Sequence, residues 1–500
     1  MTMSARRTSS GAPVVALVCL GIFMTTLDAS IVNIGLPSVA RAFDTPLNGA
    51  LEWIIICYLV VIGGLLLTFG RLSDMIGRSP IWITGLVVFT IGSAVCGAAP
   101  SLGLLIAARA LQGIGGAMIL STSTALLGSA VPPSQRGHAL GWGAVAVALG
   151  ASAGPTIGGL LTAYASWRWI FYVNVPIGLL AILATLRLIP PAIGHNEEKF
   201  DLGGAVLVAV ALASLNLGLS FGQEWGWTST RVLGLLLVGA AALIAAVVVE
   251  LRSAHPIIDI HLFHNRVFVS SVVSLLCSML ALFAVGFLLP FYAEELRGFD
   301  AQRTGLLLTP FPVAMAIVSP VAGALSDRVG SRWLAPIALT ITAVALLLLT
   351  QLDATSSMAA IAWRLALAGV GLGLFQAPNT RSLMDAAPES QQGMASGVFA
   401  TTRVTGQALS VAVAGAVFAS FGGAAAGTAL ASHALHGTAG SAGQRVVEVA
   451  TFLRGFHAAL GTCAAFAGLG ALVALLRGHE RGLRPSPRSV GSATPAAIAR

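Results

Sequence analysis

Apolar runs, most of them about twenty residues long, recur along the whole chain and are separated by short polar segments. A helix needs about 20 apolar residues to cross the roughly 30 Å hydrocarbon layer of a membrane, where no backbone group can bond to water. The pattern predicts fourteen spans, near residues 13–36, 52–70, 80–99, 102–130, 139–163, 169–189, 203–222, 231–250, 267–292, 304–325, 333–351, 358–378, 394–420 and 450–476. We therefore expect an all-α polytopic membrane protein.

The composition favours the same class, because 56% of the 500 residues are hydrophobic and only 9% are charged. Soluble domains carry roughly a quarter of charged residues. The formal charge of +8 could indicate nucleic-acid binding, but the basic residues lie mostly singly between apolar runs, which argues against it. The five cysteines also lie within apolar runs and lack metal-ligand spacing, so we expect small apolar packing groups.

The basic residues predict the orientation of the chain. One alternating set of loops and tails carries seventeen Lys and Arg residues, the other carries six, and four lie within the runs. Loops rich in Lys and Arg stay on the cytoplasmic side. We expect both termini in the cytoplasm and the protein in the inner membrane.

Two loops repeat one motif. The segment GRLSDMIGRS begins at Gly70, GALSDRVGSR begins at Gly323, and five of ten positions agree. Two related six-helix halves are typical of transporters that expose a central site alternately to each face. Glycines allow close helix approach, and an aspartate can bind the free amides of a helix start. The predicted gating residues are Gly70, Asp74, Gly77, Arg78, Gly323, Asp327 and Gly330. A generic polar turn with orienting arginines is the alternative.

The repeat is offset by eight spans instead of six, which places two extra helices between the halves. The predicted division is an N-terminal tail (1–11), a six-helix bundle (12–190), an inserted helix pair with its linker (191–266), a second six-helix bundle (267–477) and a disordered basic tail (478–500). Residues 421–449 are rich in small side chains and read as an external loop.

Charged residues within spans are costly and usually face a cavity. Asp28 is the only carboxylate well inside an unambiguous span, and Arg109 lies in the middle of the fourth. A buried carboxyl could take up a proton from one side and release it to the other. Alternatively Asp28 is structural and bonded to backbone or Asn33. Arg109 cannot deprotonate and must find an acceptor. Its partner could be Asp28 across the bundle, but the sequence does not identify the carboxylate.

Four further segments carry a resemblance to a known family: LDASIVNIGLP from Leu27, RALQGIGGA from Arg109, GASAGPTIGG from Gly150 and SWRWIFYVNVPIG from Ser166. With the repeated loop, they resemble the fourteen-span drug:proton antiporter branch of the major facilitator superfamily. The resemblance covers about residues 12–478 and implies the major facilitator fold, with Arg109 in a proton relay. It also implies an antiporter hinge at Gly150, Gly154, Pro155, Gly158 and Gly159, for which ordinary tight packing is the alternative.

Polar side chains within spans usually face away from lipid, so they are candidates for a substrate cavity. These are Asn33, Gln112, Gln376, Asn379 and Arg403. For Arg403, a long side chain that carries its charge to the membrane interface is an equal alternative.

The sequence contains none of the motifs that ATP-driven transport or hydrolytic catalysis would require. There is no nucleotide-binding loop and no hydrolase or metalloprotease motif. We expect no enzyme activity, no cofactor and no metal, and partners limited to a small organic substrate, protons and membrane lipid around a monomer. The favoured function is proton-coupled export of amphipathic compounds. The alternatives are export or uptake of one dedicated metabolite and, more remotely, a membrane receptor.

Overall fold

A computed structural model describes residues 11–44, 49–189, 200–222, 225–252, 260–299, 301–436 and 442–477. Within these ranges the regular structure is entirely helical. Both predicted tails lie almost wholly outside the described residues. The first half of the chain contains α1 (Ala12–Ala42), α2 (Gly49–Ile76), α3 (Arg78–Ala98), α4 (Leu102–Ser129), α5 (Arg136–Tyr164), α6 (Trp169–Tyr172) and α7 (Asn174–Leu188).

The inserted pair and the second half follow. The pair is α8 (Leu202–Phe221) and α9 (Thr230–Arg252). The second half contains α10 (Arg266–Phe291), α11 (Ala301–Leu308), α12 (Pro310–Val329), α13 (Leu334–Leu349), α14 (Met358–Asp385), α15 (Gln392–Ser420), α16 (Gly423–His436) and α17 (Ala442–Leu475).

Each of the fourteen predicted spans corresponds to a helix or to two consecutive helices of the structure. Among the described residues, twelve spans are long and apolar enough to cross a membrane, and a thirteenth results if α15 and α16 count as one span bent by 78°. Helix α13 is apolar but shorter. The protein is therefore a multi-pass membrane protein with two six-helix bundles and an inserted pair.

The segment predicted as an external loop, residues 421–449, differs from that expectation. It contains α16, and α17 begins within it at Ala442. Alanine is the strongest helix former, so an alanine-rich stretch forms a helix without a long apolar face. Gly422 has φ of +78°, a left-handed conformation that suits glycine, and it makes the bend between α15 and α16.

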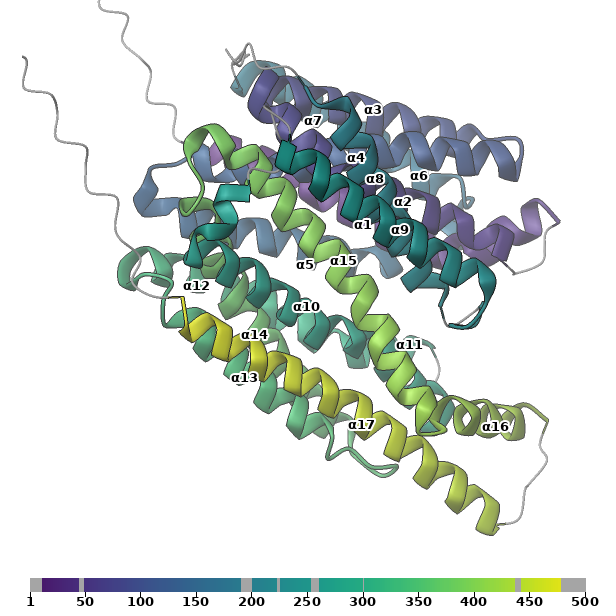
Figure 1. The fold of residues 1–500 in the computed structure, drawn as a ribbon. Coiled ribbons are helices and arrows are strands. Elements are labelled where there is room, and N and C mark those ends of the chain that lie inside the picture. Colours follow the sequence, from purple (N-terminus) through teal and green to yellow (C-terminus); the bar gives the residue numbers. More distant parts are fainter. Residues whose placement is uncertain are drawn as a thin grey trace, which may run out of the picture.

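The two halves touch mainly through two crossed pairs of helices, α5 with α12 and α2 with α15. In Figure 1 the helix axes of the halves lie close together at the end where α5 and α15 begin, and they diverge toward α16. Helix α8 packs on α9 and also contacts both α2 and α15. The inserted pair therefore lies beside a contact between the halves.

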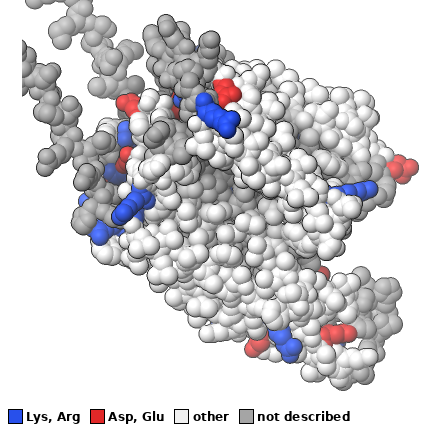
Figure 2. All heavy atoms as spheres, viewed as in Figure 1, with Lys and Arg blue, Asp and Glu red and all other residues white. Residues whose placement is uncertain are grey.

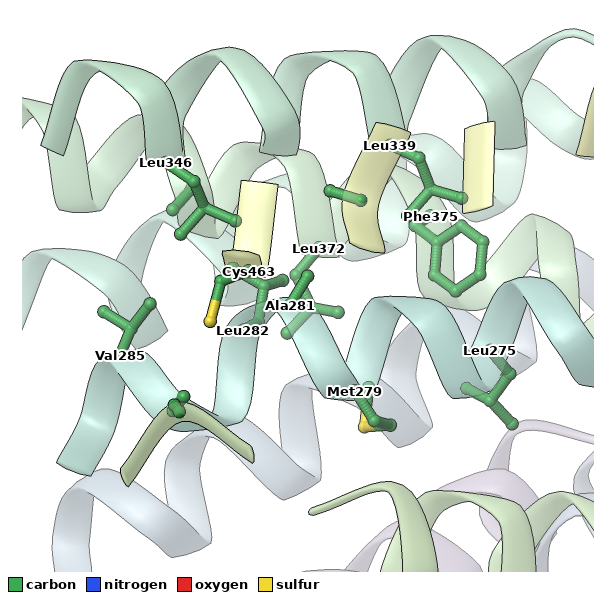
Figure 3. Packing of buried hydrophobic residues seen from close by; sticks show 14 of the residues in the cluster. Leu275, Met279, Ala281, Leu282, Val285, Leu339, Leu346, Leu372, Phe375 and Cys463 are labelled. Atoms are coloured by element: carbon green, nitrogen blue, oxygen red, sulfur yellow. The ribbon is translucent and has the colours of Figure 1, made fainter. Parts of the chain in front are cut away.

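The surface and the core have the character of a membrane protein. Figure 2 shows a broad uncharged middle region, with acidic and basic residues near the ends of the molecule. In the second half, one cluster of buried residues contains Leu275 and Val285 of α10, Leu346 of α13, Phe375 of α14 and Cys463 of α17 (Figure 3). The five cysteines are free thiols, and Cys463 occupies space in the core as a small apolar group.

Candidate functional site

A buried ion pair joins the first and fourth helices. Asp28 of α1 and Arg109 of α4 are both inaccessible to solvent, and Arg109 Nη1 lies 2.6 Å from Asp28 Oδ2. The sequence singled out both residues and left the partner of Arg109 open. The structure pairs them directly.

Two amides complete the surroundings of the Asp28 carboxylate. Gln112 Nε2 donates to Asp28 Oδ1 at 2.8 Å, and Asn174 Nδ2 of α7 donates to the same oxygen at 2.9 Å. Arg109 Nη1 also donates to Gln112 Oε1 at 2.7 Å, which fixes the orientation of that amide. Arg109, Gln112 and Asn174 each donate a hydrogen bond to the Asp28 carboxylate, a set of partners that suits its ionised form.

Two further partners of Arg109 lie on α2. Its Nε donates to the carbonyl oxygen of Ile54 at 2.9 Å, and its guanidinium lies 4.1 Å from the centre of the Tyr58 ring. A buried ion pair is tolerated only when hydrogen bonds satisfy its remaining donors and acceptors. The site therefore ties α1, α2, α4 and α7 together around one neutral pair of charges.

Helical spacing and glycines explain the geometry. Arg109 and Gln112 are three residues apart and share one face of α4. A Cβ at Gly92 of α3 would lie 2.9 Å from the Gln112 Cα, and one at Gly113 would lie 3.0 Å from the Tyr58 carbonyl oxygen. Only glycine allows α3 and α2 to approach α4 this closely.

Asn174 and Ser93 also belong to the site and were not predicted from the sequence. Asn174 Nδ2 also contacts Ser93 Oγ at 3.2 Å, and Ser93 Oγ donates to the Phe171 carbonyl oxygen at 2.8 Å. A signal was present, because Asn174 is a lone amide within an apolar segment that the family resemblance included. The sequence could not show that α7 brings it to Asp28.

The repeated loops form two equivalent contacts between the halves. Asp74, at the end of α2, accepts hydrogen bonds from the backbone N–H groups of Gly393 and Met394, both at 2.7 Å. These residues begin α15. A carboxylate at a helix start is favoured by the free N–H groups and by the helix dipole.

The second copy makes the same contact in the opposite direction. Asp327, at the end of α12, accepts from Gly137 N at 2.9 Å and His138 N at 3.0 Å, at the start of α5. Arg381 Nη1 adds an ion pair to Asp327 at 2.6 Å. Each half thus places a carboxylate on a helix start of the other half.

The two helix starts that receive these carboxylates are themselves a sequence repeat, which was not among the predicted motifs. PPSQRGHA from Pro132 and PESQQGMA from Pro388 agree at five of eight positions. Their shared glycines are Gly137 and Gly393, which receive the two carboxylates. The signal was visible in the sequence, but its meaning required knowing which loop faces which helix.

The remaining residues of the repeated loops have local roles. Gly77 and Gly330 have φ of 103° and 81°, conformations that favour glycine, and they end α2 and α12. A Cβ at Gly70 would lie 2.7 Å from the Gly393 carbonyl oxygen, and one at Gly323 would lie 2.1 Å from that of Gly137. Arg78 Nη2 donates to the Glu389 carbonyl oxygen at 2.9 Å across the same interface.

The comparisons with known proteins identify the family of the chain. A family model described as Major Facilitator Superfamily matches residues 18–411, and a second match spans 272–499. The chain belongs to the major facilitator superfamily. Members are transporters and not enzymes, so this facilitator carries small substrates across a membrane.

Named relatives point to the multidrug efflux type of the family. Multidrug resistance protein Stp of Mycobacterium tuberculosis is 35% identical over 80% of this chain and 75% of its own length. The tetracenomycin C resistance and export protein of Streptomyces glaucescens is 29% identical over 82% of this chain and 76% of its own. The solved structure of the proton:xylose symporter XylE is 14% identical with a TM-score of 0.62, covers 93% and 95% of the two chains, and supports the fold.

The facilitator's glycine-rich segment on α5 packs against α1 beside the ion pair. A Cβ at Gly150 would lie 2.8 Å from the Phe23 carbonyl oxygen, and one at Gly154 would lie 1.9 Å from Ser30 Oγ. Gly158 is buried, whereas a Cβ at Gly159 would meet open space. Pro155 lies within α5. A hinge at this contact stays a prediction.

We expect Gly150→Val to lower transport about tenfold, because the added side chain would force α1 away from α5 near Asp28, at a cost of roughly 1–3 kcal/mol of stability. Transport in membrane vesicles and thermal unfolding of the purified protein measure the two effects. Gly461→Val in α17 is the control, since a Cβ there meets nothing within 4 Å. Equal behaviour of the two variants would contradict a role for this contact.

The predicted cavity residues lie in different places. Gln112 belongs to the Asp28 site. Asn379 of α14 donates to the Ser271 carbonyl oxygen at 3.0 Å and accepts from Arg477, within the second bundle. Gln376 is buried one turn before it. Arg403 lies in the middle of α15. The side chain of Asn33 lies outside the described residues.

Removing the two repeated carboxylates should open the end of the bundle that they join. In Asp74→Ala/Asp327→Ala, we expect the ratio of the separated to the joined arrangement of this end to rise about 30-fold, because the two lost helix caps cost about 1 kcal/mol each. Spin labels on a cysteine-free background, at Ser134→Cys and Ser390→Cys, measure the distance between the halves.

The matched control is Asp201→Ala. Asp201 also caps a helix, accepting from Gly204 N at 2.8 Å, but its contact stays at the start of α8 and does not cross between the halves. An unchanged distance in the double variant, or the same change in the control, would show that these caps do not hold the end closed.

Proposed function

We propose that this facilitator is a proton-driven exporter: a proton moves inward while an amphipathic organic compound moves outward. The observation that supports it most is the Asp28 carboxylate, held in the interior by Arg109, Gln112 and Asn174. An ionisable group inside a membrane is costly and is typical of proton relays. The names of the relatives, with resistance and export in them, favour outward transport.

The proposed coupling uses the ion pair itself. A proton bound to Asp28 removes the negative charge that offsets Arg109, so the pair weakens and the four helices that it joins can separate. Loss of the proton restores the charge-assisted hydrogen bonds and draws the helices together. The site thereby favours one arrangement of α1 and α4 when ionised and another when protonated.

The proposed gate is the pair of Asp74 and Asp327 contacts. They join the halves at one end of the bundle, while the helix axes diverge toward the other end (Figure 1). We assign the joined end to the cytoplasm, because most Lys and Arg residues of the loops belong to that side. Both termini would then be cytoplasmic and the protein would lie in the inner membrane as a monomer in contact with lipid, with the described arrangement open outward.

In this scheme the substrate leaves from the described arrangement and a proton enters it. Protonation of Asp28 would release the cytoplasmic contacts, and the two six-helix bundles (12–190 and 267–477) would rock past each other. Crossed pairs α5–α12 and α2–α15 would be broken at the cytoplasmic end only. The glycine face of α5 would act as the hinge.

Export of one dedicated compound is a second candidate. One relative is named for resistance to and export of a single compound, tetracenomycin C. The same ion pair and gate would serve both functions, so the breadth of the substrate range distinguishes them.

Everted membrane vesicles test the proposal. Respiration acidifies their lumen, and an exporter that exchanges protons should accumulate dye in the lumen and dissipate part of the pH gradient. Fluorescein and rhodamine 123 serve as probes of opposite charge on one ring system. Accumulation that persists after a protonophore collapses the gradient would overturn proton drive, and loss of dye from the lumen on energisation would overturn export.

A further inference from the structure

Arg403 of α15 has no assigned partner in the proposed cycle. It lies mid-helix within the bent span formed by α15 and α16. The residue is partly accessible. In the parts of the chain that the structure describes, neither a carboxylate nor a carbonyl nor an aromatic ring pairs with it. An arginine cannot shed its charge, so it requires an acceptor.

The neighbours of α15 show where Arg403 points. Gly397 and Val404 face α2, since a Cβ at Gly397 would lie 2.9 Å from the Leu66 carbonyl oxygen and Val404 lies beside Gly63. On another side, Gly406 and Ser410 face α10: a Cβ at Gly406 would lie 2.8 Å from Met279 Cβ, and Ser410 Oγ donates to the Leu280 carbonyl oxygen at 2.9 Å.

Arg403 falls between these two faces. With about 100° per residue, it and Gln407 lie on the strip of α15 between α2 and α10. Ala400, on the same strip, packs with the apolar core of the first half. The strip therefore faces the interior between the halves, and not lipid. Gln407 is one turn beyond Arg403 and is likewise partly accessible.

No carboxylate of the described interior offsets the positive charge of Arg403. Asp28 is already neutralised by Arg109. The other carboxylates in the described spans lie within about two turns of helix ends, as Asp74, Asp327 and Glu250 do. In the part of the interior that the described residues form between the halves, one positive charge is thus in excess, and it attracts anions and repels cations.

We propose that Arg403, with Gln407 beside it, binds an acidic group of the transported compound, so that the substrates are amphipathic organic anions such as carboxylates and sulfonates. A guanidinium binds a carboxylate or sulfonate through two parallel hydrogen bonds, and the amide adds a third donor. The substrate supplies the acceptor that the protein lacks. This inference rests on the proposed export function and assigns its substrate class.

The test compares fluorescein with rhodamine 123, which share a ring system and carry opposite charges, in binding to purified protein and in transport by everted vesicles. We expect the unaltered protein to prefer fluorescein. Arg403→Gln should weaken fluorescein binding at least about tenfold, because the charge-assisted bonds are lost, and Arg403→Lys should recover part of it. The effect should fall on binding and KM, with the proton dependence of transport unchanged.

Arg454→Gln is the matched control, because it removes the same charge from an exposed position on α17. Preference of the unaltered protein for rhodamine 123, no binding of either dye, or equal fluorescein binding by Arg403→Gln and the control would overturn the inference. Failure of the export proposal gives a different result. The rate of transport of both dyes would then be the same with and without the pH gradient.

Discussion

Asp28→Asn is expected to abolish accumulation of dye by energised vesicles, lowering the rate by about 100-fold or more, in the range attributed to a positioned proton-transfer group. Asparagine has almost the shape of aspartate and can still accept from Gln112 and Asn174. It cannot bind and release a proton, and it gives Arg109 no counter-charge. The measurement is the initial rate of dye uptake together with the accompanying change in luminal pH.

Asp353→Asn provides the control for that loss. Asp353 lies outside the spanning helices, between α13 and α14, and is exposed. Hydrogen bonds from the Thr355 side chain and backbone hold the pKa of its carboxyl below the usual value. Removing this charge should leave transport unchanged. Full uptake by Asp28→Asn would contradict a coupling role, and equal loss in the control would point to general damage.

Arg109→Gln is expected to lose transport and also to unfold more easily. It leaves the Asp28 carboxylate buried without its cation, and breaking a buried pair from one side costs about 3–5 kcal/mol. The stability measurement is thermal unfolding of the purified protein in detergent. The large effect arises from the charge that is left behind, and not only from the lost contact.

The double variant Asp28→Asn/Arg109→Gln separates stability from coupling. With both charges removed, no uncompensated charge remains, so most of the lost unfolding temperature should return. Transport driven by the gradient should stay absent, since no group remains to carry the proton. A double variant as unstable as Arg109→Gln would show that the two side chains do not compensate each other.

Much of the fold could be predicted from the sequence, because a membrane imposes one simple requirement on each span. All fourteen apolar runs correspond to helices. The exception was α16, whose alanines and glycines carry little hydrophobic signal although alanine favours helix. Its position at 78° to α15 depends on the turn at Gly422 and its φ of +78°.

The candidate site could be predicted only in part. Asp28, Arg109 and Gln112 were found because charged and amide groups are rare within spans. Their pairing, and the contribution of Asn174 from α7, depend on how helices distant in sequence pack together. Asn379 illustrates the same limit, since its nearest partners are Ser271 and Arg477 in the same half.

The most direct measurement compares two fluxes of dye in proteoliposomes that contain Asp28→Asn. One flux is exchange of labelled for unlabelled dye with no pH difference, and the other is accumulation against a dye gradient when a pH difference is imposed. If Asp28 carries the coupled proton, exchange should persist while accumulation and proton movement both disappear. Accumulation at the normal rate, with protons still moving in exchange, would contradict this role for Asp28.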